Sequence, residues 1–461
     1  MIRTFFRYGF YFFIVILLIA IGLFVYGRQQ KATPGQLAAL EELRKKPKFS
    51  ESENLAPYLW LLNYDVPADK IDEITAADAK KYNALTSSKS IAEFQSSAAS
   101  KYPKLDLYPR EFDGYCQFRN GLSCLREVSK EKDKISTTLS RLQKEISRVE
   151  KVTNYRAHYS PFELHMSGQL PSMSAGENIM RVQRAKLFLD GEQYTAIEKV
   201  CGDIAAYRSL STNSDTLIVA MVSQAYVRNR LSLLADMLTR TDQNSLLPPQ
   251  CAIAVKPITP EENQLCNAMR GEFNTLENLD VWLSDSSVEN VSAVNRIKHQ
   301  AANFFYDHER TLSLLAPRYA VFCGEEARAA ANANTALNIS KVLVNSNAVC
   351  GLSDRVSNAY GCELLDIAIP SYESYLQRRL DQSAQITAMQ ILFWLRDKKA
   401  IADNYEKLFT ERPKNLQAFS DRIRLNRDQG KIEVDLLGPA IDGEKTWGLP
   451  LPPSMLANAA Q

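Results

Sequence analysis

Residues 8–27 read YGFYFFIVILLIAIGLFVYG and contain no charged side chain. At a rise of about 1.5 Å per residue, a helix of this length spans about 30 Å, the thickness of the hydrocarbon core of a bilayer. Tyr8, Tyr11 and Tyr26 lie near its two ends, where amphipathic rings prefer the headgroup level. The stretch therefore predicts one transmembrane helix, through which the chain contacts the lipid bilayer.

Two other interpretations of residues 8–27 stay open. A cleaved signal peptide usually has a shorter apolar region of about 7–15 residues, although Val25-Tyr26-Gly27 could pass as a weak cleavage site. A buried core helix rarely runs this long without a polar face. No second stretch approaches this length, so we expect a single-pass protein whose remaining chain lies in water.

The chain as a whole has the composition of a globular protein. Of its 461 residues, 45% are hydrophobic and 23% are charged, which excludes wholesale disorder. The formal net charge is +2, so the chain lacks the basic footprint of a nucleic-acid-binding protein. We therefore expect no nucleic acid among its partners.

Basic residues flank both ends of the apolar stretch, so the positive-inside rule does not decide its orientation. The eight cysteines form no CxxC pair and have no histidine at a zinc-finger spacing. An even number with several short spacings is typical of disulfides in an oxidising compartment. We therefore expect a bacterial inner-membrane protein with residues 1–7 in the cytoplasm and its large domain in the periplasm. Reduced, buried thiols in a cytosolic domain are the alternative.

Two cysteine pairs enclose short loops. Cys116 and Cys124 flank QFRNGLS, which has a turn-prone Asn-Gly at its centre, and Cys350 and Cys362 flank GLSDRVSNAYG. Loops of these lengths close at low entropic cost, and each bridge would stabilise the fold by about 2–4 kcal/mol. We expect both bridges to form.

The other four cysteines are paired by the same reasoning. Cys251 follows a double proline, and Cys266 lies on a helix predicted to begin at Pro260, so the loop between them can fold back. Cys201 and Cys323 are then left over, and could form a long-range bridge or remain free. Eight cysteines allow 105 pairings, and loop length is the criterion that favours this one.

A stripe of apolar residues runs through the polar segment 125–152. Spacings of three and four alternate in a heptad pattern, broken once at Lys132, so we expect one continuous helix. The stripe either packs on the chain's own domain or forms a coiled-coil face for a second copy or a protein partner. This candidate partner face consists of Leu125, Val128, Ile135, Leu139, Leu142, Ile146 and Val149.

Helical periodicity continues along the chain with few strand signals. Thr259-Pro260-Glu261-Glu262 supplies a hydroxyl cap, a first-position proline and a third-position glutamate, and Ser214-Asp215 is a similar start. Residues 431–436 alternate like a strand, followed by a turn at Asp442-Gly443. The predicted helices cover residues 179–190, 192–209, 214–240, 260–270, 275–286, 292–317, 324–346 and 371–398.

Together these segments predict a mainly α protein. Residues 28–56 form a membrane-proximal linker, and the apolar block PYLWLLNYDVP, residues 57–67, docks it onto the domain or offers an exposed partner site. An irregular α-helical bundle then occupies residues 57–430, and a small β-hairpin or extended tail follows over 431–461. LFLDGEQYTAIEKV, residues 187–200, is similar to a tetratricopeptide unit, but no second copy follows at the period of about 34 residues. A solenoid-like domain stays the alternative.

The anchor followed by PYLWLLNYDVP, the cysteine pair in YCQFRNGLSCL, and the NYRAHYSPFEL loop leading to SDTLIVAMV form a layout. This layout resembles single-pass inner-membrane proteins of Gram-negative bacteria with a helical periplasmic domain. The resemblance implies a location and a helical fold, and it implies no activity.

No motif for catalysis, cofactor binding or metal binding is visible, and we expect no cofactor. The chain has four histidines: His158 and His165 flank Pro161 in a loop, and His299 and His308 fall on opposite faces of one predicted helix. We expect all four to be solvated or capping residues. Two functions remain: a periplasmic scaffold or interaction protein of an envelope complex, or a membrane-tethered hydrolase whose site is assembled from distant residues.

The predicted bridges can be tested with a thiol reagent on the denatured protein. With three bridges formed, at most Cys201 and Cys323 should react before a reductant is added, and all eight cysteines afterwards. Reaction of all eight without reductant would contradict the periplasmic location.

Overall fold

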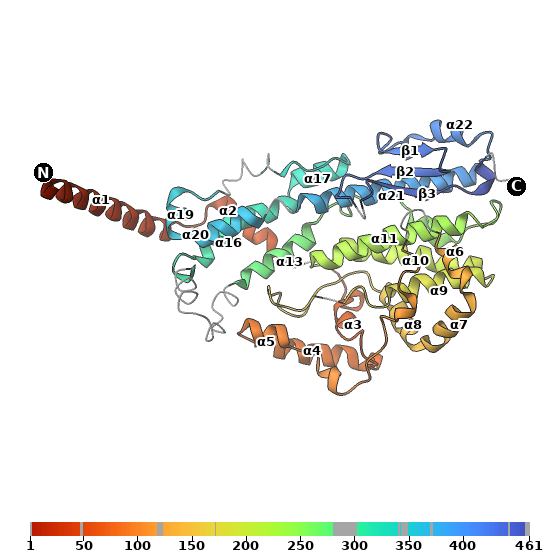
Figure 1. Cartoon of the computed structure of the whole chain (residues 1–461), viewed down its shortest axis with the longest axis horizontal. Helices are drawn as coiled ribbons and strands as arrows, with labels where there is room; N and C mark the ends of the chain where they lie inside the picture. The colour runs from red at the N-terminus through yellow and green to blue at the C-terminus, as the bar shows by residue number, and fades with distance from the viewer. Residues whose placement is uncertain are drawn as a thin grey trace.

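The computed structural model describes residues 2–46, 49–117, 123–170, 172–279, 302–339, 342, 349–368, 372–440 and 443–456. Over these residues the protein is mainly helical, with 19 α-helices and a small three-stranded sheet near the C-terminus, which confirms the prediction of a mainly α protein. α1 (Ile2–Arg28) projects from one end of an elongated body, and the C-terminus lies at the opposite end (Figure 1). The solenoid alternative stays a prediction.

α1 is the one helix among the described residues that is long and apolar enough to cross a membrane. The most apolar 18 residues within Arg7–Arg28 are not buried by the rest of the chain, whereas Gly27 near the end of the helix is buried. By length and composition alone, the helix fits a membrane span or a signal sequence.

The larger of two hydrophobic cores lies under the middle and the C-terminal end of the body. It contains the apolar block around Tyr58 and Leu62, both of which are buried, so this block is not an exposed partner site. The helices of this part are α3 (Ala56–Trp60), α4 (Ile71–Tyr82), α5 (Ser88–Glu93), α6 (Cys124–Lys130), α7 (Lys132–Arg141), α8 (Gln143–Glu150), α9 (Glu177–Leu189), α10 (Gln193–Thr212), α11 (Leu217–Leu238), α12 (Pro249–Ala254), α21 (Glu373–Asp397) and α22 (Tyr405–Thr410).

The second core lies closer to α1. Within the predicted linker, a helix begins at Pro34 with a capping box, in which Thr33 and Gln36 exchange hydrogen bonds, and it packs on the domain through Leu40 and Leu43. The helices of this part are α2 (Pro34–Leu43), α13 (Cys266–Glu277), α16 (His308–Ala320), α17 (Glu325–Asn332), α19 (Leu352–Ser357) and α20 (Ala359–Ala368).

The C-terminal strands form an antiparallel sheet in the order β1-β2-β3, which packs on α21. Ile432, Val434 and Leu449 turn into the larger core, so the predicted tail from residue 431 begins inside a packed sheet. Asp381 of α21 pairs with Arg422 and accepts a hydrogen bond from the Leu437 amide (2.8 Å). The strands are β1 (Ile423–Asn426), β2 (Lys431–Asp435) and β3 (Thr446–Pro450).

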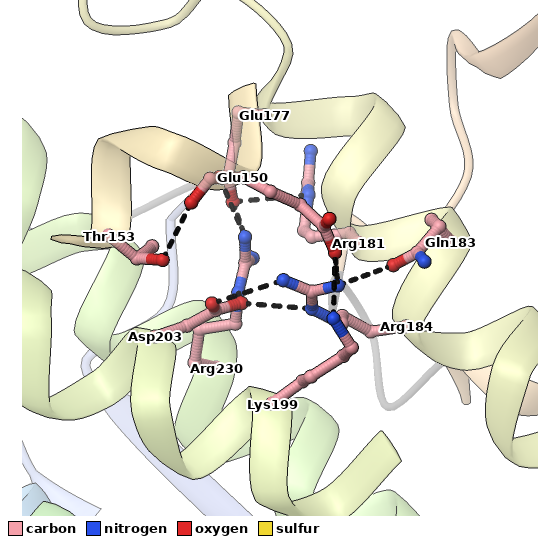
Figure 2. A network of polar contacts seen from close by, with 9 residues as sticks. All are labelled: Glu150, Thr153, Glu177, Arg181, Gln183, Arg184, Lys199, Asp203 and Arg230. Atoms are coloured by element: carbon pink, nitrogen blue, oxygen red, sulfur yellow. Dashed lines mark hydrogen bonds and ion pairs between the residues drawn. The ribbon is translucent and has the colours of Figure 1, made fainter. Parts of the chain in front are cut away.

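Helices α9, α10 and α11 are joined by a buried ionic network (Figure 2). Arg230 of α11 has no exposed surface, and its guanidinium donates to both oxygens of Glu177 on α9 (2.7 and 2.9 Å) and to Asp203 on α10 (3.0 Å). Burial by itself lowers the pKa of Arg230, but the two carboxylates outweigh burial and raise the pKa above its ordinary value. The arginine therefore stays charged inside the protein.

The same network reaches the surface through Arg184 of α9. Its guanidinium lies 3.4 Å from Asp203 and 2.6 Å from Glu150 of α8, and Lys199 of α10 also donates to Glu150 (3.0 Å; Figure 2). Four helices are thus held in one relative position by groups that cannot be left unpaired when buried.

The predicted continuous helix over residues 125–152 is wrong. The chain forms α6, α7 and α8 instead, with breaks at Glu131 and Leu142, whose backbone dihedral angles leave the helical region. The first break adjoins Lys132, where the heptad pattern fails, and the two breaks let the apolar stripe bend around α9.

The prediction that the apolar stripe forms a face for a partner is also wrong. All seven of its side chains are at most 7% exposed, because α9 and its neighbours cover them. The stripe is therefore core, as its alternative interpretation held, and no coiled coil is shown. Its members are Leu125, Val128, Ile135, Leu139, Leu142, Ile146 and Val149.

All eight cysteines pair at disulfide distances. Cys116–Cys124 and Cys350–Cys362 are confirmed, with Cα–Cα distances of 4.3 and 5.9 Å. The predicted Cys251–Cys266 pair is wrong, because the structure joins Cys201 to Cys251 and Cys266 to Cys323, with Cα–Cα distances of 4.8 and 4.6 Å. Cys201 and Cys323, which the prediction left over, are therefore neither free nor paired with each other.

The observed disulfide pairing follows from the way the helices pack. α12 packs on α10, which brings Cys251 beside Cys201. Thr259 and Glu262 do exchange cap hydrogen bonds, but the turn that they close stops, and the next helix begins only at Cys266. That residue lies beside the turn that ends α16, where Cys323 is located. Helix packing, and not loop length, therefore determines which cysteines form these two disulfides.

Several predicted helices have other bounds. The helix over residues 292–317 is interrupted, since α16 begins at His308 with Asp307 as its cap, and His299 lies outside the described residues. The helical pair over residues 179–209 forms as predicted. Tyr194, the tyrosine of the segment similar to a tetratricopeptide unit, is 53% exposed. Near Ser214, α11 begins without a side-chain cap.

Replacing Arg230 by methionine tests the ionic network. Arg230→Met leaves Glu177 and Asp203 buried without their main cation, which should lower the free energy of unfolding by about 3–5 kcal/mol. Denaturant unfolding in detergent, without reductant, measures the change. Arg240→Met, at an exposed arginine just after α11, is the matched control and should change it by less than about 0.5 kcal/mol. Equal effects would contradict the central role of the network.

Candidate functional site

A cavity of about 470 Å³ opens between α3 and α4 on one side and the beginning of α11 and the middle of α13 on the other. The loop over residues 158–170 crosses between these elements and supplies much of the wall. Met166 and Leu170 of this loop are 58% and 73% exposed, and they also line the cavity. The volume suits a small ligand.

Aromatic rings form one side of the cavity. The rings of Trp60 and Phe162 lie 4.4 Å apart, and Tyr82 meets Phe162 edge to face at 5.4 Å. Trp60 is held by its indole N–H, which donates to the buried Asp78 carboxylate at 2.9 Å. Burial, with a smaller contribution from the Glu163 carboxylate, raises the pKa of Tyr82 to about 12, so its hydroxyl remains protonated.

His158 reaches the cavity from a short piece of extended backbone. Its amide donates to the Asn213 carbonyl (2.8 Å), and its carbonyl accepts from the Asp215 amide (3.0 Å). This pairing brings the His158 Nδ1 within 2.8 Å of the Asp215 carboxylate, which also accepts from the Ser160 amide (2.6 Å). The predicted solvated histidine is wrong, because His158 is 2% exposed and is oriented by a carboxylate.

Close packing of α13 supports this pair. A Cβ atom on Gly271 would lie 1.4 Å from the Asp215 carbonyl oxygen, so only glycine lets α13 approach the segment so closely. His165, in the same loop as His158, also lies near a carboxylate. Its Nε2 atom is 3.8 Å from the Glu163 side chain. The side chain of His165 is only 4% exposed, so this histidine is not solvated either.

Glu272 lies at the inner wall, where α11 begins. Its carboxylate accepts from the Leu217 amide (3.2 Å), which takes the place of a side-chain cap on that helix. Burial raises the pKa of Glu272 above its ordinary value, and the hydrogen bond to the amide opposes the shift without cancelling it. Beside it, the buried Thr216 hydroxyl makes no hydrogen bond within the described part of the chain.

The polar side chains that line the cavity are histidines, hydroxyls, amides and carboxyl groups. Among the described residues, neither lysine nor arginine lines it. Besides Glu163 and Glu272, the lining includes the amides of Asn63, Gln95 and Gln169. A cavity of this kind suits neutral hydrogen-bonding groups and does not attract phosphate or carboxylate groups, for which arginine and lysine are the usual partners.

One other cluster has metal-ligand side chains. Within the described residues, Glu42, Cys266 and Cys323 are the one group of three such side chains whose ligand atoms lie within 4.8 Å of one another. The two sulfurs belong to a disulfide and are not thiolates, so the cluster offers a single carboxylate while that bridge stands.

None of the cysteines or stripe residues singled out in the sequence lines the cavity. The structure brings together residues that the sequence separates, such as His158 with Asp215 and Thr216 with Glu272. Trp60 was visible within the apolar block and Asp215 at a predicted helix start, but Glu272 falls between the predicted helices over residues 260–270 and 275–286. No local signal could have identified it.

The chain matches no protein-family model, no curated protein and no solved structure.

The raised pKa of Glu272 predicts a pH-dependent stability. A carboxyl group whose pKa is higher in the folded state destabilises the fold once pH rises above the unfolded value of about 4.5. Glu272→Gln keeps the acceptor for the Leu217 amide and removes the ionisation. The variant should therefore unfold at a higher temperature than the parent at pH 8, and the gain should vanish at pH 4.

Thermal unfolding in detergent at the two pH values provides the measurement. Glu163→Gln is the matched control, because the Glu163 side chain lines the same cavity but is 53% exposed. A pH-dependent gain of the same size in the control would contradict the role of burial.

Proposed function

We propose that the protein is a single-pass, membrane-anchored interaction protein of the bacterial envelope. In this proposal, α1 is the anchor, the folded domain lies in the periplasm, and the cavity holds an uncharged, hydroxyl-rich ligand of the glycan class. The observation that carries the proposal is the cavity itself, in which aromatic rings face amides and carboxyl groups without a lysine or arginine among the described lining residues.

The contacts of the last turn of α1 support an anchor that is retained. Arg28 pairs with Asp307 (3.4 Å), and Gln30 accepts a hydrogen bond from Arg310 (2.7 Å), which in turn is bidentate to Asp354. A Cβ atom on Gly27 would meet the Ser357 hydroxyl at 2.2 Å, so α1 and α19 are in close contact. Cleavage near Gly27 would remove one half of this interface.

The disulfides support the periplasmic side. Four bridges account for all eight cysteines, and none is free. Such bridges persist in oxidising compartments and are rare where glutathione keeps thiols reduced.

The ligand class follows from the chemistry of the lining. Sugar rings present apolar C–H faces, which pack on aromatic rings, and hydroxyl groups, which hydrogen-bond to amides and carboxylates. Within the described chain, the Asn63 and Gln95 side-chain amides have no other hydrogen-bond partner. They are therefore available to a ligand.

A hydrolase is the second candidate, and Glu272 favours it. A buried carboxyl with a raised pKa is the form in which glycosidases hold their general acid, and a second carboxylate, Glu163, lines the same cavity. His158, oriented by Asp215, is a further acid–base group on the wall. In this case Glu272→Gln abolishes turnover of a bound glycan but leaves its binding intact.

Calorimetric titration of the full chain in detergent with N-acetylglucosamine oligomers tests the proposal. We expect saturable binding, and we expect it to weaken at least about tenfold, or about 1.4 kcal/mol, in the double variant Asn63→Ala/Gln95→Ala. Gln429→Ala, on the turn between β1 and β2, removes an exposed amide away from the cavity and is the matched control.

The charge of the ligand provides the contrary outcome. A sugar phosphate or an acidic peptide should bind more weakly than the neutral oligomer, because neither lysine nor arginine is among the described residues that line the cavity, whereas two carboxyl groups are. Stronger binding of either anion, or oligomer binding that the double variant does not weaken, would overturn the proposed ligand class.

A further inference from the structure

The last turn of α1 packs against aromatic residues of the folded domain. The ring of Phe24 is stacked on the ring of Phe304 at 5.1 Å with an interplanar angle of 10°, and it meets Phe305 edge to face at 6.2 Å. Phe304 and Phe305 lie in the segment that precedes α16. Phe304 is 280 residues from Phe24 along the chain. The folded domain therefore contacts the side of the apolar helix within its last two turns, and not only the end of the helix.

The position of Phe24 along α1 sets the depth of this contact. Phe24 precedes Gly27, the last residue of the apolar stretch, by three positions, or about 4.5 Å along the helix axis. Helical side chains tilt toward the N-terminus, which for α1 is toward the centre of the bilayer. When α1 spans the membrane, the Phe24 ring lies in the acyl region, and the Phe304 ring stacked on it lies at the same depth.

The residues at this depth have the surface that a bilayer requires. Phe304 is 60% exposed in the folded chain, and Leu352, the first residue of α19, is 69% exposed beside the end of α1. Polar backbone there is satisfied: the Phe304 carbonyl accepts from the Arg28 guanidinium at 2.6 Å. Exposed apolar side chains of this size are costly in water and favourable in the interfacial layer.

We infer that Phe304, Phe305 and Leu352 form a membrane wedge that enters the leaflet next to the domain, beside α1. The wedge continues the surface of the anchor, and its partner is lipid. Together with the close contact between Gly27 and α19, it fixes the domain on the membrane surface at one angle, so the domain does not swing on a flexible linker. The inference rests on the part of the proposed function that makes α1 a membrane span.

Quenching of tryptophan by brominated lipids tests the wedge. The full chain, with Phe304→Trp or Leu352→Trp, is reconstituted in phosphatidylcholine vesicles whose acyl chains are brominated near the headgroup or near the methyl end. The emission added by the new tryptophan over the four native ones should lose most of its intensity with headgroup-proximal bromine, and less with methyl-end bromine. Leu246→Trp, an 88% exposed position in the loop after α11, is the control and should lose none.

Resistance to alkaline carbonate extraction from the same vesicles separates the two levels of the proposal. If the chain resists extraction but neither added tryptophan is quenched, or if the control is quenched equally, the wedge is overturned and the anchor stands. If carbonate removes the chain from the vesicles, the proposed anchor falls, and the wedge falls with it. Unchanged thermal unfolding of the variants shows that they fold, as expected for substitutions at exposed positions.

Discussion

Arg230 is completely removed from solvent, and its charge is tolerable only because Glu177 and Asp203 meet it from two neighbouring helices. Removing an ion from water costs several kcal/mol even after the protein relaxes, so the three groups have to stay together for the helices to pack. α9, α10 and α11 are thereby held in one register, and the apolar stripe of α6, α7 and α8 closes over α9. The middle of the body is arranged around this contact.

The cavity depends on the same helices. Arg230 and Thr216, the residue that precedes α11, are separated by fourteen residues, or about 21 Å along the helix axis. Because α11 is one continuous helix, the ionic network at Arg230 also fixes the position of its N-terminus at the cavity. At that beginning Glu272 takes the amide that a capping side chain would have taken, and Gly271 admits the backbone that carries Asp215. A partly buried carboxyl, an oriented histidine and a hydroxyl without a hydrogen-bond partner in the described part of the chain come together as a result.

The anchor and the cavity make one proposal because both sit on rigid parts of the fold. Contacts from Phe24 and Arg28 tie α1 to the residues before α16, and α13, which carries Glu272, packs on α16 in the second core. If α1 spans a membrane as proposed, a domain held by these contacts presents its cavity at one height and angle above the bilayer. That geometry suits the capture of a ligand that is itself held in the envelope.

Local chemistry alone was enough for some of the structure. The apolar run of α1, the helices on either side of residue 191 and the strand at Lys431–Asp435 follow from hydropathy and periodicity, which depend on neighbours a few positions away. Only the tertiary structure decided that the stripe is core, that Cys201 joins Cys251, and that His158, Thr216 and Glu272 line one cavity. These outcomes depend on which helices pack together, and packing energy is shared among residues far apart in the chain, so no local pattern records it.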